Sequence, residues 1–555
     1  MSLPHAGLRP IEEVAAELGV APLHVSPRGR DMAKLDPAAI DAGPGTGKLV
    51  LMSAITPTPA GEGKTTMSVG LAMGLRRIGK RAVACLREPS LGPVFGIKGG
   101  GTGGGRATLE PEDRINLHFT GDLHAITAAH NLLAAMIDND LHFQDKQGGA
   151  ASGLDPRKIT WPRVLDANDR ALRNVVIGLG GDGAPRESRF DITAASEVMA
   201  ILCLATSLDD LRERLGRIVV GRRGDGRFVT AKDLGAHGAM AALLSDARWP
   251  NLAQTAEGGP AIVHGGPFAN IAHGCSSVLG TKLALAHGDI AITEGGFAFD
   301  LGGAKFLDIK CRAAGIWPNA VVLVATLRAL KMHGGAPLSA VDEPNAAALD
   351  AGLTNLEAHL ESVARFGITP LVCINEHLHD RDDELKRVLA FCDARGVRAA
   401  RSAAFAKGGE GSIELAELVS DAVSKPATAP RFLYPLEASF EEKVERIAVE
   451  LYGADGVDIT SAAAKSVKAY AEAGYRDLPV CVAKAFRSLS DDATKLGRPK
   501  GFRVTVREVR LSAGAGFLVA LMGDVMTMPG LPRRPAALDV DVDDAGNIRG
   551  LMRSK

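Results

Sequence analysis

The sequence has few aromatic residues and almost no excess of charge. Aromatic side chains make up 4% of its 555 residues, and 64 lysines and arginines balance 65 aspartates and glutamates. Proteins that bind nucleic acids or anionic membranes usually carry a basic excess or a basic patch, and the near-neutral balance gives no such footprint. The composition therefore predicts neither a nucleic-acid partner nor a membrane partner.

Long apolar runs and a secretion signal are also missing. No uninterrupted apolar stretch approaches the roughly 18 residues that span a bilayer, and residues 1–18 lack a basic region followed by an apolar core. The seven cysteines, odd in number and scattered through apolar segments, are typical of buried free thiols in a reducing compartment. We therefore expect a cytoplasmic protein.

Glycine, by contrast, is abundant, and one glycine-rich loop lies between an apolar run at residues 49–55 and a helical pattern at 67–78. A strand, such a loop and a helix together present backbone N–H groups to a phosphate. Lys64 adds positive charge and Thr65 offers a hydroxyl to magnesium, although Thr58 replaces the first glycine of G-x-x-x-x-G-K-[ST]. A tight turn with a solvated lysine is the alternative. We assign ATP phosphate binding to Thr56, Pro57, Thr58, Pro59, Ala60, Gly61, Glu62, Gly63, Lys64, Thr65 and Thr66.

Apolar runs alternate with helical patterns along much of the chain. Further buried strands are predicted at residues 82–86, 261–264, 290–293, 320–325 and 370–375. This alternation predicts an α/β fold, with a P-loop NTPase-like parallel sheet and helices on both faces. Residues 1–108 and 255–357 are predicted to form the large nucleotide-binding domain, 109–254 a mainly helical insertion, and 358–555 a C-terminal α/β domain.

A second candidate anion site follows the predicted strand at 82–86. Arg87 and Glu88 lie at its carboxyl end, and from Gly99 to Gly105 every residue but Thr102 is glycine, with Lys98 and Arg106 at the flanks. Such a run can form a nest of N–H donors, and a guanidinium at a strand end can hold an anion bidentately. A flexible loop, and an ordinary ion pair of Arg87 with Glu88 or another acid, are the alternatives.

Three other polar clusters have weaker signals. His118, Asp122, His124 and His130 match no compact zinc spacing, so capping by Asp122 and hydrogen-bonded histidines are favoured over a metal site. Cys275 with His264 or His273 is a conceivable thiol nucleophile, but a small buried cysteine is favoured. The loop at 293–312 holds Glu294, Asp300 and Lys305, to which the sequence alone gives no role.

Ten segments, in order along the chain, resemble a single family. They are TPTPAGEGKTT, REPSLGPVFGIKGG, NLHFTGDLHAI, ITWPRVLDANDRALR, ITAASEVMAILCLA, GGPFANIAHGCSS, DLGGAKFLDIKCR, KMHGG, YGADGV and SAGAGFLVALMGDVMTMPGLP. Together they resemble formate–tetrahydrofolate ligase, also called formyltetrahydrofolate synthetase, of the single-function bacterial type. The resemblance runs from about Arg9 to the C-terminus.

The resemblance implies an ATP-dependent ligation of formate to tetrahydrofolate through formyl phosphate. It implies ATP with Mg²⁺, a monovalent cation activator such as K⁺ or NH₄⁺, and a homotetramer, with the C-terminal domain contributing to the folate and adenine pocket. Lys64, Arg87 and Glu88 would be catalytic, and Thr65 would bind the metal. The residues that match the formyl-phosphate motif are Arg87, Ser90, Leu91 and Gly92.

Departures from the family pattern gather on the pterin side. His377 and Phe405 stand where the family tends to place a phenylalanine and a tryptophan that stack on the folate ring. Arg106 occupies a position that is usually aromatic, and Ala304 one that is usually glutamate. The family's Lys-Thr-Gln-Tyr is here Lys484, Ala485, Phe486 and Arg487. Because imidazole and phenylalanine offer less stacking surface than the usual pair, we expect a weaker or altered pterin site.

Two other functions remain open from the residues alone. One is a P-loop ligase that activates a different small carboxylate, and the other is a nucleotide-switched binding protein. Formation of a formylated folate from formate and ATP distinguishes both from the ligase that the motifs resemble.

Overall fold

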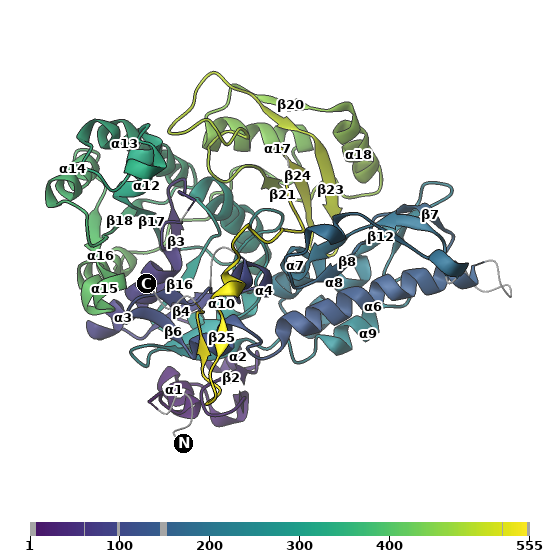
Figure 1. Ribbon diagram of the computed structural model, residues 1–555, viewed down its shortest axis with the longest axis horizontal. Helices are drawn as coiled ribbons and strands as arrows, with labels where there is room; N and C mark the ends of the chain where they lie inside the picture. The colour runs from purple at the N-terminus through teal and green to yellow at the C-terminus, as the bar shows by residue number, and fades with distance from the viewer. Residues whose placement is uncertain are drawn as a thin grey trace.

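The structure, a computed structural model, describes residues 7–59, 61–96, 100–144, 152–181, 183–523 and 525–551. Within these residues, the chain is built around a 12-stranded sheet whose central strands are parallel (Figure 1). Their order across the sheet is β15 (Pro260–Val263), β4 (Ala82–Leu86), β16 (Ile290–Glu294), β3 (Lys48–Ala54), β17 (Ala320–Ala325), β18 (Pro370–Asn375) and β19 (Ala399–Ser402). Every strand predicted from an apolar run is present.

One edge of the sheet is antiparallel. The strand β14 (Asn251–Thr255) pairs antiparallel with β15, and the edge is completed by β1 (Val25–Pro27), β2 (Ala33–Leu35), β5 (Gly103–Gly104) and β6 (Ala107–Glu110). At the other edge, β18 and β19 continue the same sheet beyond residue 357. The boundary predicted there therefore falls between two neighbouring strands.

Helices cover both faces of the sheet, as predicted. Alternate side chains of β3 point to opposite faces, so that Leu49 and Leu51 join one core while Val50 and Met52 join the other. The first face packs on α1 (Ile11–Leu18), α10 (Val278–His287), α12 (Leu327–His333), α13 (Ala346–Arg365) and α14 (Asp382–Asp393). The second packs on α3 (Lys64–Arg77) and α16 (Ile413–Ser424). Because both faces of β3 are buried, its sequence is a continuous apolar run and does not alternate between apolar and polar residues.

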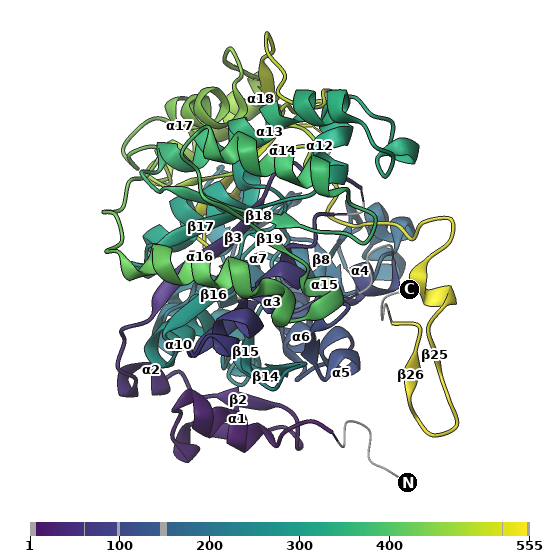
Figure 2. The same cartoon turned by 90° about the vertical axis from the view of Figure 1, so that its left-hand side faces the viewer.

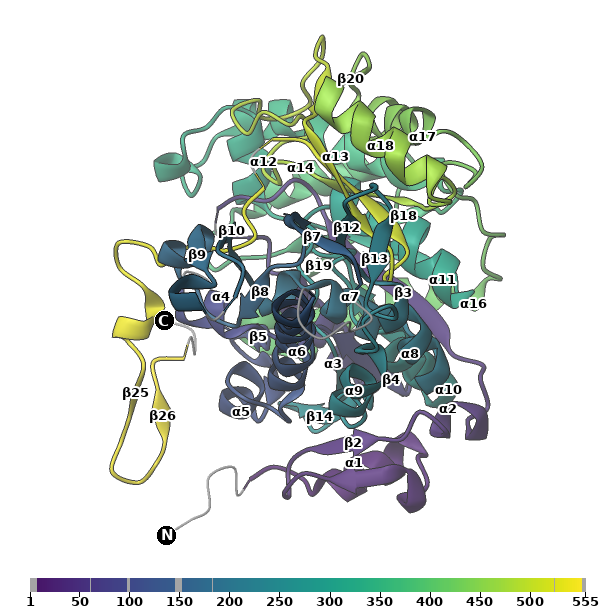
Figure 3. The same cartoon turned by 90° about the vertical axis from the view of Figure 1, so that its right-hand side faces the viewer.

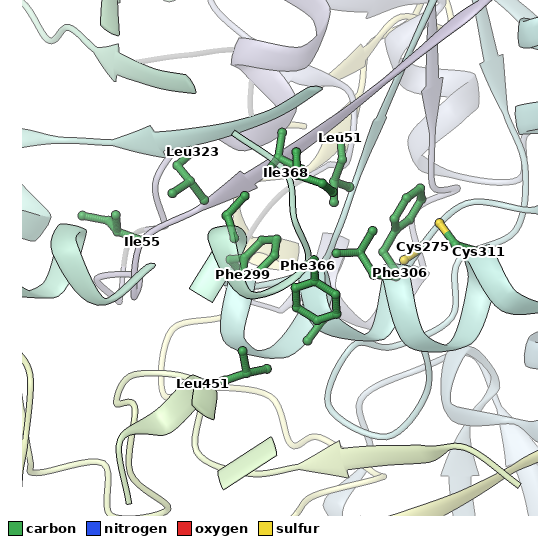
Figure 4. Close-up of a cluster of buried hydrophobic side chains, with 14 of the residues drawn as sticks. Leu51, Ile55, Cys275, Phe299, Phe306, Cys311, Leu323, Phe366, Ile368 and Leu451 are labelled. Atoms are coloured by element: carbon green, nitrogen blue, oxygen red, sulfur yellow. The ribbon is translucent and has the colours of Figure 1, made fainter. Parts of the chain in front are cut away.

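Figure 4 shows part of the first core, where Leu51 and Leu323 of the sheet meet Phe299, Phe306 and Phe366. Phe299 and Phe366 make an edge-on contact with ring centroids 5.8 Å apart. These rings come from the segment after β16 and from the end of α13. The core thus fixes the segment that leaves β16 against the helices that flank the sheet.

Much of the block from 109 to 254 forms a lobe beside the sheet (Figure 1), and its core also takes in side chains from the C-terminal part, among them Cys481 and Phe517. The helices of the block are α5 (Glu112–Asn116), α6 (Asp122–Phe143), α7 (Glu197–Leu204), α8 (Leu208–Arg217) and α9 (His237–Leu243). Short strands join them: β7 (Leu154–Ile159), β8 (Arg163–Leu165), β9 (Val175–Ile177), β10 (Arg186–Ser188), β11 (Phe190–Ile192), β12 (Val219–Arg223) and β13 (Phe228–Thr230). The helical pattern at 194–215 is two helices rather than one, because Ser207 caps α8.

The last part of the chain adds a third α/β lobe. It contains α17 (Phe440–Ile447), β20 (Val457–Ile459), α18 (Ser461–Glu472), β21 (Val480–Ala483), β22 (Val504–Val506), β23 (Glu508–Ser512) and β24 (Phe517–Leu521). A final hairpin, β25 (Asp541–Val542) and β26 (Ile548–Arg549), projects from the body (Figures 2 and 3). None of the helices in the described ranges has the length and apolarity that a bilayer crossing requires.

Two glycines let α12 and α13 cross at very short range. A Cβ on Gly352 would overlap the carbonyl of Leu330, and a Cβ on Gly334 would overlap the carbonyl of Ala348. The contact matters for function because both helices send side chains to the start of the glycine-rich loop, His333 from α12 and Asn355 from α13. The loop is therefore held by a helix pair that only glycine permits.

We predict that Gly352→Ala destabilises the protein although alanine favours a helix. The added methyl group meets the backbone of α12, so the two helices must separate, at a cost of about 1–3 kcal/mol. Gly238→Ala in α9 is the matched control, since its Cβ meets nothing within 4 Å. Urea denaturation should show a lower midpoint for the first variant and an unchanged or higher midpoint for the second. Equal midpoints in the two variants would contradict the tight crossing.

Candidate functional site

Three neighbouring parallel strands end at one edge of the sheet with polar residues. The strand β4 leads into Arg87, β16 ends at Glu294, and β3 leads into the glycine-rich loop that begins near Thr56. Because β16 lies between the other two strands, Glu294 is placed between the loop and Arg87. The carboxyl edge of a parallel sheet is where such folds bind their ligands.

Glu294 connects the two sides of this site. Its carboxylate accepts a hydrogen bond from Thr65 Oγ1 at 3.0 Å and lies 4.0 Å from the guanidinium of Arg87. The side chain is nearly buried, which strengthens both interactions. The sequence marks Glu294 as a residue at a strand end but gives it no role. Its role follows from long-range strand pairing, which no local pattern reports.

The start of the loop is anchored through every polar group of Thr56. The Thr56 N–H donates to Asn355 Oδ1 at 3.2 Å, its hydroxyl lies 3.0 Å from His359 Nε2, and its carbonyl accepts from His333 Nε2 at 2.9 Å. All four residues are buried. The structure therefore uses Thr56, which the sequence assigns to phosphate binding, to fix the loop on α12 and α13.

Glu62, within the loop, makes a second set of hydrogen bonds that hold the loop in place. Its carboxylate accepts from the Thr58 N–H at 2.7 Å and from the hydroxyl of Thr326. Its carbonyl accepts from Asn375 Nδ2 at 3.1 Å. The N–H of Thr58, at the position where the usual motif has glycine, is thereby satisfied within the protein. Thr58 and Glu62 shape the loop instead of presenting these groups outward.

The remaining loop residues form the entry to α3. Gly61 and Gly63 have φ of +82° and +69°, values that side chains rarely adopt, and Gly63 is the residue that precedes the helix. Lys64, Thr65 and Thr66 form its first turn and are half-buried. The helix N-terminus thus opens toward Glu294 and Arg87. Of the other predicted loop residues, Pro57 is buried, Pro59 is exposed and Ala60 lies outside the described residues.

Arg87 is held in place while part of its guanidinium stays available. One Nη donates to the carbonyl of Pro267 at 3.3 Å, and the side chain is 27% exposed. Its Nε is buried and has no hydrogen-bond partner among the described residues. A buried N–H without a partner is uncommon and costly, which favours a ligand that accepts from it. The acid near Arg87 is Glu294 and not Glu88, so the alternative of an ion pair with another acid is met in part, at 4.0 Å.

The segment after Arg87 packs against the inserted lobe. Ser90 Oγ donates to Asp166 at 2.5 Å, the N–H of Leu91 donates to the same carboxylate at 3.0 Å, and Asn168 Nδ2 donates to the carbonyl of Gly92 at 2.8 Å. In this structure the groups assigned to formyl phosphate therefore contact Asp166. Sequence reasoning gave Asp166 no role; its only signal was its place in the motif ITWPRVLDANDRALR.

Glu88 lies in a buried cluster of acids. Burial raises the pKa of Glu88 well above its usual range, and the negative charges of Asp122 and Asp166 raise it further, against the lowering effect of Lys34. Lys34 pairs with Asp122 at 2.7 Å in the interior. One carboxyl oxygen of Glu88 has no hydrogen-bond partner in the described part of the chain. Burial and the neighbouring carboxylates thus make ionisation of Glu88 costly.

The described glycines that follow are packed rather than open. A Cβ on Gly103 would overlap the carbonyl of Ala107, and one on Gly105 would overlap the carbonyl of Phe405. The N–H of Arg106 donates to the same Phe405 carbonyl at 2.9 Å. These glycines allow two chain segments to touch. Lys98 and Gly99, which the sequence includes in this candidate anion site, lie outside the described residues.

The two residues predicted to stack on a planar ring both follow strands of the sheet. His377 follows β18 and is half-buried, its N–H donating to Asp380 at 2.8 Å, and burial lowers the pKa of its imidazole. Phe405 follows β19, lies against Gly104 and is 44% exposed. The described residues show no ring contact between them, and a second aromatic pair, Phe297 and Phe486, stacks with centroids 4.6 Å apart.

The remaining polar clusters are structural. Burial raises the pKa of the Cys275 thiol to about 11 and lowers the pKa of the His273 imidazole, and His264 is bound by Ser277 and the carbonyl of Ala247. These observations favour the small buried cysteine over a thiolate pair. All seven cysteines are free and buried, as predicted. Asp122 does not cap its helix, contrary to expectation, because Lys34 and Asn251 hold its carboxylate.

Comparisons with known proteins agree across the chain. The family model described as formate–tetrahydrofolate ligase matches residues 4–552. A formate–tetrahydrofolate ligase of Myxococcus xanthus (strain DK1622) is 58% identical over 554 residues, covering 99% of this chain and 100% of the relative. One of Paracoccus denitrificans (strain Pd 1222) is 53% identical over 547 residues, covering 98% of each.

The histidines that anchor Thr56 predict an acid-sensitive site. Burial lowers the pKa of His333 and of His359 to about 4, whereas the unfolded chain binds these protons near pH 6.5. Stability is therefore complete above about pH 6.5 and falls toward pH 4, by at most about 3 kcal/mol for each histidine. Urea midpoints measured from pH 7.5 to 4.5 should show this fall. His359→Gln should make this fall smaller, while His333, His130 and His264, whose pKa burial also lowers to about 4, keep contributing to it. His379→Gln, at an exposed site, should leave the fall unchanged; equal slopes for the two variants would contradict the assignment.

Proposed function

Because the chain belongs to the formate–tetrahydrofolate ligase family, we propose that it joins formate to tetrahydrofolate with ATP, giving 10-formyltetrahydrofolate, ADP and phosphate. We further propose formyl phosphate as the intermediate. The observation that carries the proposal is Glu294, which contacts Thr65 of the loop and Arg87 at once. A phosphate donor and a second anion can therefore meet across one carboxylate.

The loop supplies the ATP half of the reaction. The N-terminus of α3 and the positive charge of Lys64 would stabilise charge on the transferring phosphoryl group, as in P-loop NTPases. A formate oxygen attacks the γ-phosphorus, the bond to the β–γ bridging oxygen breaks, and ADP leaves. The contacts of Thr56 and Glu62 support this assignment, since they hold the loop in shape before any nucleotide binds.

Magnesium fits the same place. The Thr65 hydroxyl and the Glu294 carboxylate lie 3.0 Å apart and are the hard oxygen donors that Mg²⁺ combines with water and phosphate oxygens. Mg²⁺ bound there supplies neutralisation of the phosphate charges. Together with the parallel sheet, this donor pair supports the P-loop NTPase-like description, with the lobes at 109–254 and at the C-terminal end as the two smaller domains.

Arg87 would hold formate and then formyl phosphate. Its unpartnered Nε and partly exposed guanidinium suit a carboxylate and a phosphate, which accept bidentate hydrogen bonds. Ser90 and Leu91 would line the pocket with Gly92. N10 of tetrahydrofolate attacks the formyl carbon, the bond to the phosphate oxygen breaks, and the N10 proton is lost. Glu88, next in the chain, supports this site from the buried side.

We propose a monovalent cation, potassium or ammonium, as an activator from the family alone. The described residues contain no cluster of three or more histidines, cysteines or carboxylates that could hold a metal ion. We also propose that the enzyme is a cytoplasmic homotetramer, that His377 and Phe405 flank the pterin, and that the C-terminal lobe contributes to the folate and adenine pocket.

We predict that Lys64→Ala and Arg87→Ala each lose at least about 100-fold of the rate, because each removes charge stabilisation of the transition state. The assay mixes protein, ATP, formate and tetrahydrofolate, then reads the absorbance of 5,10-methenyltetrahydrofolate after acidification. Lys80→Ala, at an exposed position at the end of α3, is the control and should keep the rate. Undiminished turnover in either test variant would refute its role, and ADP release with acetate instead of formate would favour a different ligase.

We predict that His377→Phe lowers the Michaelis constant for tetrahydrofolate, by about 2- to 10-fold, since phenylalanine offers a larger apolar face for stacking. The constant for formate should not change. His379→Phe, two residues away and exposed, serves as the matched control. If the Michaelis constant of the unaltered enzyme lies in the family's ordinary range and His377→Phe leaves it unchanged, His377 does not weaken the pterin site.

A further inference from the structure

A cavity of about 260 Å³ lies where the inserted lobe meets the segment before the C-terminal hairpin. We call it the arginine pocket. The residues that line it and carry the argument are Arg173, Arg189, Phe190, Asp191, Met526 and Thr527. Figure 3 shows the surrounding elements, with β8, β9 and β10 beside the C-terminal segment. No residue that lines this pocket has a role in the reaction proposed for Lys64 and Arg87.

The pocket carries unneutralised positive charge. Arg173 donates to the carbonyl of Met528 at 2.9 Å and contacts the sulfur of Met526, but it has no carboxylate partner among the described residues. Arg189 shares Asp191 with Thr527, at 3.2 Å and 2.6 Å. Two guanidinium groups therefore face one carboxylate. Arginine in such a setting is suited to an anionic ligand, and above all to a carboxylate held bidentately.

Two contacts place the pocket beside the proposed reaction centre. Arg87 donates to the carbonyl of Pro267, and three residues further on Asn270 donates to the carbonyl of Met526 in the pocket wall at 3.1 Å. Three residues of chain span at most about 11 Å. Independently, Gly92 lies against Ile192, the last residue of β11, and the N–H of Ile192 donates to the carbonyl of Thr527 at 2.8 Å.

The structure of the folate substrate matches the separation between Arg87 and the arginine pocket. N10, which receives the formyl group, is bonded directly to the benzoyl ring, and the amide on that ring carries glutamate. The glutamyl carboxylates must therefore lie one benzoyl group away from the reacting atom. The apolar side chains of Phe190 and Met526 at the pocket would contact the ring or the methylene groups of the tail.

We propose that the arginine pocket binds the carboxylates of the folate's glutamyl tail, with Arg173 as the main contact and Arg189 as the second. The proposal rests on the proposed function, since it names the part of the folate substrate that this surface recognises. It gives the pocket a role in affinity for polyglutamylated folate. It gives no role to Arg173 in the transfer of the formyl group.

The test compares Arg173→Gln with the unaltered enzyme, using tetrahydrofolate with one and with three glutamates. We expect the Michaelis constant for the triglutamate to rise about 10-fold, because a charge-assisted contact is lost. The constants for ATP and formate, the turnover number and the thermal midpoint should not change. Arg173→Lys should restore part of the affinity. Arg212→Gln, at an exposed position on α8, is the matched control and should behave as the unaltered enzyme.

A second measurement uses p-aminobenzoyl-triglutamate, which carries the tail without the pterin. It should inhibit competitively with tetrahydrofolate, and more weakly against Arg173→Gln; Arg189→Gln provides the same comparison should Arg173→Gln fail to fold. An unchanged triglutamate constant, or a changed constant for ATP, overturns the proposal. If the unaltered enzyme forms no product from any folate, the proposed function itself fails. If it turns over normally and Arg173→Gln leaves the Michaelis constant for the triglutamate unchanged, only this inference fails.

Discussion

The adjacency of three parallel strands is the constraint on which the site depends. Since β16 is inserted between β4 and β3, which the chain itself joins through α3, Glu294 lies between two segments that are already close in sequence. One carboxylate then holds a hydroxyl on one side and faces a guanidinium on the other.

The parts of the fold that depend on local pattern were predictable. The strands around the site are buried on both faces, so each appears in the sequence as a short continuous apolar run, and β4 and β18 begin and end where such runs predict. The short strands of the inserted block were not predictable, because three residues such as those of β8 or β11 give no periodic signal. Ser207 divided a helical pattern that looked continuous.

The places of the candidate residues in the fold were predictable, and their contacts were less so. The positions of Lys64 and Arg87 follow from strand, loop and helix order. Thr56 and Thr58 were assigned to phosphate binding. In the structure the polar groups of Thr56 contact His333 of α12 and Asn355 of α13, and the N–H of Thr58 contacts Glu62 of the same loop. Such tasks depend on the packing of α12 and α13 against β3, which brings together residues about 300 positions apart in sequence. Local sequence patterns report none of these contacts.

The anchoring of Thr56 limits which substitutions the protein can accept during evolution. A loop whose backbone is fixed by buried partners tolerates few substitutions, since two of these partners make a further contact. Asn355 donates to the carbonyl of Gly497, and His333 accepts from the Gly497 N–H. His377 and Phe405, by contrast, lie at partly open positions after the strands, where a new side chain displaces little. Substitutions should therefore accumulate more readily at positions such as 377 and 405 than at the anchored start of the glycine-rich loop.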